Sequence, residues 1–321
     1  MLGLLKVIKN NMVMAIIIGM LVGLGIGQLI DTTPLRSMVS VVAFLMVYPM
    51  MVTLDFSSLL QKGNMKLQVV TQIINFLVLP FMAYVFGLVF FPDMIYFRLA
   101  ILLIALLPTS GMTVSWTVMS GGNVKEAIRM IVIGLLLGGV LAPFYISLYI
   151  GPTIAIPFMD VFRQIAIIVF IPMVLGFATQ RILKRRYGAE KFHEHIKPVF
   201  PMVSTLFVVV LITFVMSLRS MMLFNNPAMI PRIIIPIVLG YAMMIVGIHF
   251  VGKWLFSYAD RVALVNGTVI RSLSLSLAIA LSVFGDMGPE VALVIAIAFI
   301  VQVQLAAWYV RLNMRTLPQH S

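Results

Sequence analysis

Apolar segments of roughly 20 residues recur along the whole chain, and this pattern limits the possible folds more than any other feature. A helix of that length crosses the hydrocarbon core of a bilayer, which is about 30 Å thick. Of the 321 residues, 62% are hydrophobic and 10% are charged, whereas soluble domains carry about 25% charged residues. No stretch is polar enough for a soluble domain. We therefore predict a single all-α membrane domain over residues 1–321.

Reading the apolar runs between polar or turn-forming breaks predicts ten transmembrane helices. They lie near 11–30, 37–54, 67–91, 96–119, 126–150, 162–181, 199–218, 231–252, 262–284 and 289–312. The longest polar linker, residues 181–197, divides them into five and five. Because an odd number of spans inverts the second half relative to the first, we predict inverted repeats at about 1–155 and about 156–321.

The basic residues are distributed unevenly between the predicted loops. If both termini are cytoplasmic, sixteen of the 22 Lys and Arg residues lie on that side, five lie on the other, and Arg271 falls inside a span. This asymmetry follows the positive-inside rule. The net charge of +12 therefore indicates topology rather than nucleic-acid binding. We expect a multi-pass protein of a prokaryotic-type plasma membrane, whose partners are the lipid bilayer and a small solute; protein partners are not indicated.

The fourth predicted span is broken at Pro108, and hydroxyl side chains surround the break. Proline removes a backbone donor and crowds the carbonyl four residues earlier, so polar partners or a cavity must satisfy the freed groups. A packing kink, with each hydroxyl bonded back to its own helix, explains the same pattern. The candidate substrate-binding residues of this span are Thr109, Ser110, Thr113 and Thr117.

The ninth predicted span carries Arg271 near its middle, followed by Ser272 and Ser274. An Arg at that depth costs from about 2.5 to over 10 kcal/mol, so it should face a partner or a cavity. All ten acidic residues fall in loops or near span ends. One hypothesis is that an anionic substrate pairs with the guanidinium, helped by the two serines. The alternative is that unwound backbone carbonyls accept its hydrogen bonds, and both require a broken helix.

Small residues recur every fourth position in the first span, at Gly19, Gly23 and Gly27. Such a stripe allows two helices to approach closely. We expect packing there rather than binding. The chain has no cysteine, so a thiolate metal site is excluded. We expect no metal and no cofactor.

Several motifs resemble the bile acid:sodium symporter superfamily, which includes the arsenical-resistance permeases. The arsenical branch is similar at Met46-Val47-Tyr48-Pro49-Met50-Met51, at Trp116 and at Gly122. The symporter branch is similar at Asn75-Phe76-Leu77-Val78-Leu79-Pro80, and its crossing motif Pro-Gly-Gly-Thr-Ala-Ser-Asn aligns from Pro108. Both branches resemble the stretch from Leu275 to Gly285. The resemblance implies ten helices in inverted five-helix repeats, with helices 4 and 9 interrupted and crossing.

The departures from this family are as informative as the matches. The resemblance places the arsenical permeases' fourth-helix cysteine at Thr109 and their ninth-helix glutamate at Ser274. A hydroxyl is a much poorer ligand than a thiolate for soft arsenic(III). The symporters' sodium-ligand positions fall at Asn75, Thr113, Val114, Ala127, Ile131, Gly267, Arg271 and Ser272.

Arg271 and Gly267 replace a glutamine and a glutamate of the sodium-coupled relatives, which turns the local charge against a cation. Only Asn75 and Thr113 keep a suitable oxygen ligand, and Ser272 is a weaker replacement for asparagine. We interpret the sodium sites as degenerate, with the Arg271 guanidinium in the place of a sodium ion. Sodium binding is therefore doubtful.

The sequence favours a secondary transporter that moves a small or amphipathic organic anion by alternating access, without sodium. The alternatives are an arsenical or oxyanion efflux permease with a modified site, and a sodium-coupled bile-acid-type symporter. A membrane enzyme or a sensor is a further possibility of another class. An intramembrane hydrolase would need a nucleophile with a base or paired carboxylates, and the predicted spans contain neither. We therefore predict no catalytic residue.

Overall fold

The computed structural model describes residues 2–60, 62–151 and 158–316, and helices are the only regular secondary structure in these ranges. Contacts divide the chain into two compact units that interleave along the sequence. The first unit is Met1–Leu54, Ile154–Ile230 and Ser274–Ala296; the second is Asp55–Thr153, Pro231–Leu273 and Ile297–Ser321. Each unit is therefore assembled from segments far apart in the sequence.

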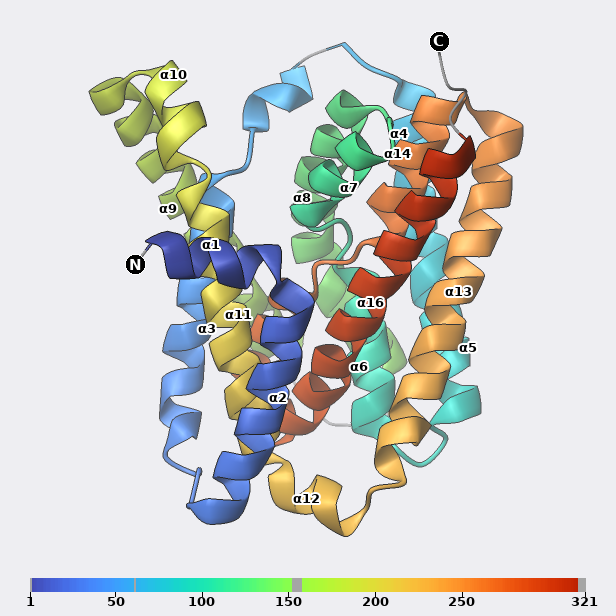
Figure 1. Cartoon of the computed structure of the whole chain (residues 1–321). Coiled ribbons are helices and arrows are strands. Elements are labelled where there is room, and N and C mark those ends of the chain that lie inside the picture. Colours follow the sequence, from blue (N-terminus) through green and yellow to red (C-terminus); the bar gives the residue numbers. More distant parts are fainter. Residues whose placement is uncertain (1, 61, 152–157, 317–321) are drawn as a thin grey trace. The chain divides into compact units, whose positions relative to one another are not determined.

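The first unit contains the N-terminal helices, the helices on either side of the long polar linker, and a later segment that begins at Ser274 (Figure 1). Its elements are α1 (Leu2–Asn10), α2 (Met12–Leu29), α3 (Leu35–Val52), α9 (Phe158–Tyr187), α10 (Ala189–Lys191), the π-turn η3 (Phe192–Ile196), α11 (Val199–Leu218), α12 (Ser220–Asn225), nearly all of α15 (Leu273–Val283), η4 (Gly285–Met287) and the first part of α16 (Gly288–Thr316).

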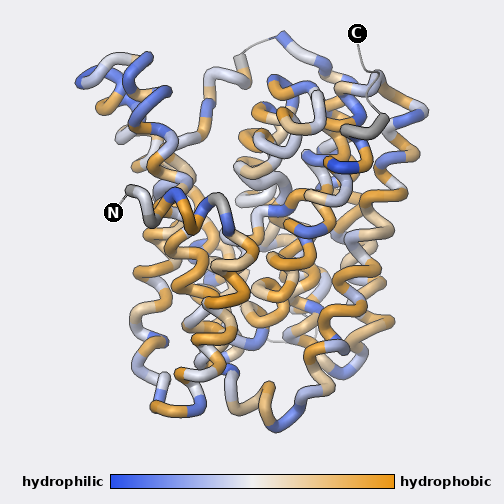
Figure 2. The backbone as a smooth tube through the Cα atoms, in the orientation of Figure 1, coloured by the Kyte–Doolittle hydropathy of each residue, from blue (hydrophilic) through white to orange (hydrophobic). Residues whose placement is uncertain are grey.

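The second unit contains the whole fourth span with its break, and the ninth span as far as its break. Its elements are η1 (Phe56–Leu60), α4 (Met65–Ile73), the π-turn η2 (Ile74–Val78), α5 (Leu79–Phe90), α6 (Ile95–Leu106), α7 (Met112–Met119), α8 (Val124–Tyr149), most of α13 (Met229–Leu255), α14 (Tyr258–Val269) and the last part of α16. Within each unit, hydrophobic residues occupy the middle of the long helices and hydrophilic residues gather toward their ends (Figure 2).

The described helices match the predicted spans to within a few residues. Nine helical runs of these ranges are long and apolar enough to cross a membrane, and one of them, Tyr258–Val283, includes the ninth break. The fourth predicted span consists of α6 and α7, and α6 has only 12 residues. The chain is thus an integral, multi-pass, all-helical protein. The count of ten and the inverted repeats stay predictions, and the repeat boundary near 155 lies outside the described residues.

The glycine stripe of α2 packs against α11, as the sequence predicted. A Cβ added to Gly23 would overlap the Thr213 carbonyl oxygen and would lie 2.9 Å from the Cβ of Met216. A Cβ on Gly27 would likewise overlap the Ser217 carbonyl oxygen. Gly25, between them, is exposed and has open space around it. The stripe therefore allows α2 and α11 to approach at backbone distance.

Substituting Gly23 by Leu should destabilise the protein because the side chain would push α2 away from the α11 backbone. Overpacking of this kind costs about 1–3 kcal/mol or more. Gly25→Leu is the matched control, since it adds the same side chain two residues away on the open face. Thermal denaturation of both variants in detergent measures the difference. Equal stability of the two variants would contradict the packing role of the stripe.

Candidate functional site

In the second unit, the break between α6 and α7 lies against the break between α14 and α15. The Ser110 backbone N–H donates to the Ile270 carbonyl at 3.0 Å, and the Ser272 N–H donates to the Leu107 carbonyl at 2.9 Å. These reciprocal bonds join two segments that lack helical partners of their own. The structure therefore confirms that both predicted interruptions exist, and it places them in contact.

The Arg271 side chain lies beside this junction, is fully buried, and donates hydrogen bonds to oxygens of three different elements. Its Nε donates to the Ile104 carbonyl at 3.0 Å, and one terminal nitrogen donates to the Thr268 carbonyl at 3.0 Å and to Asn75 Oδ1 at 2.5 Å. The other terminal nitrogen donates to the Ala105 carbonyl. The guanidinium is thus enclosed by protein oxygens, which is the second of the two arrangements predicted for it.

The carbonyls around Arg271 need donors for a reason that is visible in the sequence. Pro108 has no N–H, so the Ile104 carbonyl four residues earlier loses its helical partner. Thr109 then adopts φ 55°, a left-handed conformation that is strained for a β-branched residue. This turns the chain out of the helix, so the Ala105 carbonyl loses the Thr109 N–H that would be its donor in a continuous helix. The guanidinium supplies a donor to both carbonyls.

Asn75 reaches the guanidinium from the π-turn η2. Such turns insert an extra residue into a helix and often mark functional positions. Pro80, two residues after the turn, has no N–H to donate to the carbonyl of Phe76, which instead accepts a hydrogen bond from the Tyr145 hydroxyl. The proline at 80 and the tyrosine of α8 thus stabilise the irregular turn that carries Asn75.

Gln302 of α16 pairs with the backbone of the residue at the break. Its Oε1 accepts from the Arg271 N–H at 2.8 Å, and its Nε2 donates to the Arg271 carbonyl at 3.2 Å. The Tyr241 hydroxyl donates to the same Oε1 at 2.8 Å. Neither residue was predicted from the sequence. A glutamine in the middle of an apolar span was the signal that could have identified Gln302.

Three of the predicted hydroxyl residues bond to α14 rather than to their own helix. Thr109 Oγ1 donates to the Gly267 carbonyl at 2.8 Å, and Thr113 Oγ1 donates to the Asn266 carbonyl at 3.4 Å. Thr117 Oγ1 accepts from the Asn266 amide at 3.3 Å. All three threonines are almost completely buried. They hold the two interrupted spans together, and their role in substrate binding stays a prediction.

The predicted serines are placed differently. Ser110 and Ser272 are buried in the second unit, and Ser110 Oγ accepts the Met112 N–H at 3.3 Å. Ser274 belongs to the first unit, where its hydroxyl lies 3.9 Å from Met50 Sδ. The structure thus brings six of the seven predicted substrate-binding residues into one unit.

The positions predicted to be degenerate sodium sites offer few oxygen ligands. Ala127 and Ile131 are buried on α8, and Val114 is partly exposed on α7. Gly267 has no side chain, and a Cβ added there would overlap Met130 Sδ. The space that a longer side chain at 267 would need is therefore occupied by a thioether. The Asn75 oxygen is already used by Arg271.

No carboxylate of the described residues forms an ion pair with Arg271. The compensating charge comes from helix ends, because Ile104 and Ala105 lie in the last turn of α6 and Thr268 lies in the last turn of α14. Each helix C-terminus carries about −0.5 elementary charge. Two C-terminal ends therefore offset about one positive charge, in the way that a bound ion would be stabilised.

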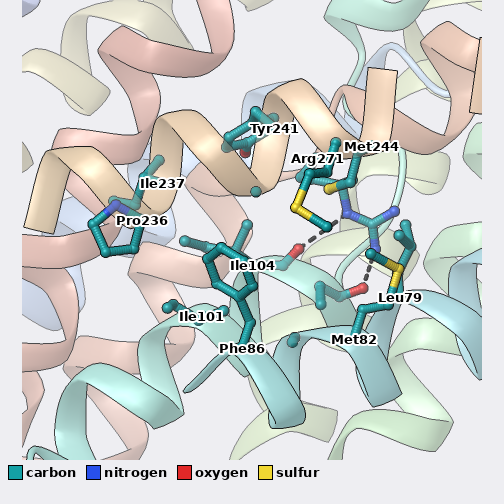
Figure 3. A pocket seen from close by; sticks show the side chains of 14 residues that line it. Leu79, Met82, Phe86, Ile101, Ile104, Pro236, Ile237, Tyr241, Met244 and Arg271 are labelled. Carbon is teal, nitrogen blue, oxygen red and sulfur yellow. Dashed lines mark hydrogen bonds between the residues drawn. The ribbon is translucent and has the colours of Figure 1, made fainter. Parts of the chain in front are cut away.

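Arg271 also borders a small cavity of about 70 Å³ between α5, α6 and α13 (Figure 3). In that view Met82 and Met244 flank the guanidinium, while Phe86, Ile101 and Pro236 lie farther along the cavity. Apart from Arg271 and Tyr241, its lining side chains are apolar. Pockets for drug-sized ligands have about 300–1,000 Å³, so this cavity is too small for a steroid-sized substrate.

Residues 40–226, more than half of the chain, match the model of the Sodium Bile acid symporter family. The chain belongs to this family. It is therefore a membrane transporter and not an enzyme, and the family resemblance of its motifs is confirmed.

Curated relatives come from two groups. The Arsenical-resistance protein Acr3 of Alkaliphilus metalliredigens is 23% identical over 92% of this chain and 89% of its own length. Sodium/bile acid cotransporter 7 of Rattus norvegicus is 26% identical over 83% of this chain and 82% of its own length. The counterpart from Danio rerio is 27% identical over 64% of this chain and 66% of its own length. The relatives thus fix the transporter class and leave the solute open.

Replacing Gln302 by Leu should destabilise the junction, because the buried Arg271 N–H and the Tyr241 hydroxyl would lose their shared acceptor. The Arg271 carbonyl would keep the Leu273 N–H as a donor. Each of the two groups left unsatisfied costs about 1–3 kcal/mol, so the melting temperature should fall by several degrees. Gln304→Leu is the control, since Gln304 is exposed on the same helix. Thermal denaturation in detergent compares the two. A similar shift in both variants would show that Gln302 has no special role.

Proposed function

We propose that this chain is a secondary transporter that moves a small or amphipathic organic anion by alternating access and without sodium coupling. The observation that carries the proposal is the carbonyl cage around the Arg271 guanidinium. By family resemblance, position 271 belongs to the sodium sites. A covalently attached cation there performs the structural task of a bound ion but cannot dissociate during a transport cycle.

The charges at the junction favour an anionic solute. The two helix C-termini whose carbonyls bond to the guanidinium are matched by two helix N-termini at the same breaks, so the partial charges of the four helix ends, about 0.5 each, roughly cancel over the junction as a whole. The guanidinium then leaves a net charge of about +1. Arg271 is too enclosed to touch a solute, but Gly111 and Ser115 at the start of α7 are exposed. We infer that the anion binds near this helix N-terminus and is attracted electrostatically by the Arg271 guanidinium without touching it.

Arg271→Gln should weaken anion binding, because the fixed charge disappears. For an assumed separation of about 8 Å and an effective dielectric constant of about 20, a unit charge contributes about 2 kcal/mol, or roughly 30-fold in affinity. Arg271→Lys is the matched variant, since both changes remove the guanidinium and only Gln removes the charge. Binding and uptake of a panel of carboxylates, bile-acid-like amphiphiles and oxyanions by proteoliposomes measures the effect.

In that comparison the Lys variant should retain more affinity than the Gln variant. Equal affinities for the best anion would refute the electrostatic part of the proposal. Arsenite and arsenate belong in the panel, because the Alkaliphilus relative is an arsenical-resistance protein. Transport of an arsenical alone would favour the second candidate, an efflux permease with a modified site. The threonine at 109, where that branch has cysteine, weighs against arsenite as the solute.

Uptake by the wild-type protein should not depend on sodium, in contrast to a sodium-coupled bile-acid-type symporter. A gain-of-function variant tests whether the residues at 267 and 271 are the cause of this sodium independence. Combining Arg271→Gln and Gly267→Glu restores the residues of the sodium-coupled relatives, and Met130→Ala makes room for the new side chain. Sodium should then raise the melting temperature of the triple variant but not that of the wild type, with choline as the control ion. A steep sodium dependence of wild-type uptake would overturn the proposal.

A further inference from the structure

The first unit contains a second cavity, which none of the preceding roles uses. It has a volume of about 250 Å³ and lies between α3, α9 and the end of α15. A cavity of about 150 Å³ is large enough to bind benzene, so this cavity has room for a larger molecule. Its lining residues are Ser40, Ala43, Phe44, Val47, Gln164, Ile167, Ile168, Ile171, Pro172 and Ser282.

The polar residues of the cavity gather at one end. Helices α3 and α9 run in the same direction, since the Tyr48 hydroxyl bonds to Thr179 and Gln180 bonds to the Val52 carbonyl. Ser40 and Gln164 therefore both lie at the starting ends of their helices, about 8–9 Å along each. All the apolar lining residues of α3 and α9 come later in their helices.

Ser282 of α15 joins the same end. It lies four residues before Asp286, whose carboxylate accepts from Arg36 NH1 at 2.6 Å. Because Arg36 is in the first turn of α3, this contact places η4, which follows α15, beside the start of α3. Within the described part of the chain, no hydrogen bond is formed by the side chains of Ser40, Gln164 or Ser282. Two hydroxyls and one amide are therefore available to a ligand.

The rest of the cavity is apolar and borders the surface of the unit. Phe44 is 40% exposed, and Ile167 and Ile171 are each 46% exposed. All three lie in helices long and apolar enough to span the membrane, where an exposed apolar side chain is compatible with contact to lipid. The lining contains no charged side chain, and a charged head group there would lack a counter-ion in a medium that penalises unpaired charge.

We propose that this cavity binds a neutral amphipath from the bilayer, with a hydroxyl or ester head and an apolar body. The head would bond to Gln164 and the two serines, and the body would pack along Phe44 and the isoleucines of α9. This site differs from the proposed anion site in both charge and position along the chain. It does not rest on the proposed function, because binding can be measured without transport.

The test is photolabelling in phosphatidylcholine nanodiscs with a long-chain alcohol that carries a diazirine in its chain. Mass spectrometry should locate the label on the lining peptides of α3 and α9. Gln164→Leu removes the main head-group partner and should reduce labelling several-fold. Ala43→Phe fills the cavity and should reduce it at least tenfold. Val41→Phe is the matched control, because Val41 is 60% exposed on α3 and does not line the cavity.

Competition by unlabelled compounds defines the chemistry of the head. The unlabelled alcohol should compete at concentrations at least tenfold lower than the fatty acid or the alkane of the same length. If the fatty acid or the alkane competes equally well, the neutral polar end has no role and the proposal fails. It also fails if label is spread over all lipid-facing helices and is unchanged in Gln164→Leu, which remains decisive should Ala43→Phe not fold.

Discussion

The hydrogen bonds between the Arg271 guanidinium and the carbonyls of α6 and α14 are the interaction on which the rest of this structure depends. Carbonyls at a helix break in a membrane cost several kcal/mol each when they have no donor. A guanidinium in the same place costs a comparable amount without acceptors. Each is therefore tolerated only because of the other. The breaks could not persist with an apolar residue at 271, and the arginine could not persist in an unbroken helix.

Several further residues make this arrangement specific. Gln302 pairs with the Arg271 backbone, and Asn75 accepts from its side chain. Thr109 and Thr113 bond to carbonyls of α14. The polar groups at the junction thus form a connected network, and networks of this kind fix one geometry because a partly satisfied alternative is costly. We infer that the junction moves as one body during transport, rather than opening at its centre.

Hydropathy and proline chemistry were sufficient to predict most of this fold. The spans lie close to their predicted positions, and Pro108 correctly marks the fourth break, because the missing N–H can be read directly from the residue type. The partner of the freed Ile104 carbonyl could not be predicted in the same way. It comes from a residue 167 positions later, and its identity depends on how two helix breaks meet in space.

Because tertiary hydrogen-bond partners cannot be read from the sequence, the first hypothesis for Arg271 paired its guanidinium with an anionic substrate. A count of side-chain charges shows that no carboxylate is near and suggests a solute as the partner. Backbone carbonyls carry no signal in such a count, although two helix ends together supply about as much negative charge as one carboxylate. Gln302 was missed for a related reason, since its partners at the break are the backbone N–H and carbonyl of Arg271. Sequence patterns thus identify where the site lies more readily than what satisfies it.

A fixed cation also changes the energetics expected of the transport cycle. A sodium ion that binds and leaves can transmit the energy of its gradient, whereas a guanidinium that stays in place transmits none. If the solute is a monoanion that crosses alone, the membrane potential acts on it with about 2.3 kcal/mol per 100 mV. An inside-negative potential then drives the anion outward. On this argument, replacing an exchangeable sodium by Arg271 would do more than remove a coupling ion: it would favour export over uptake.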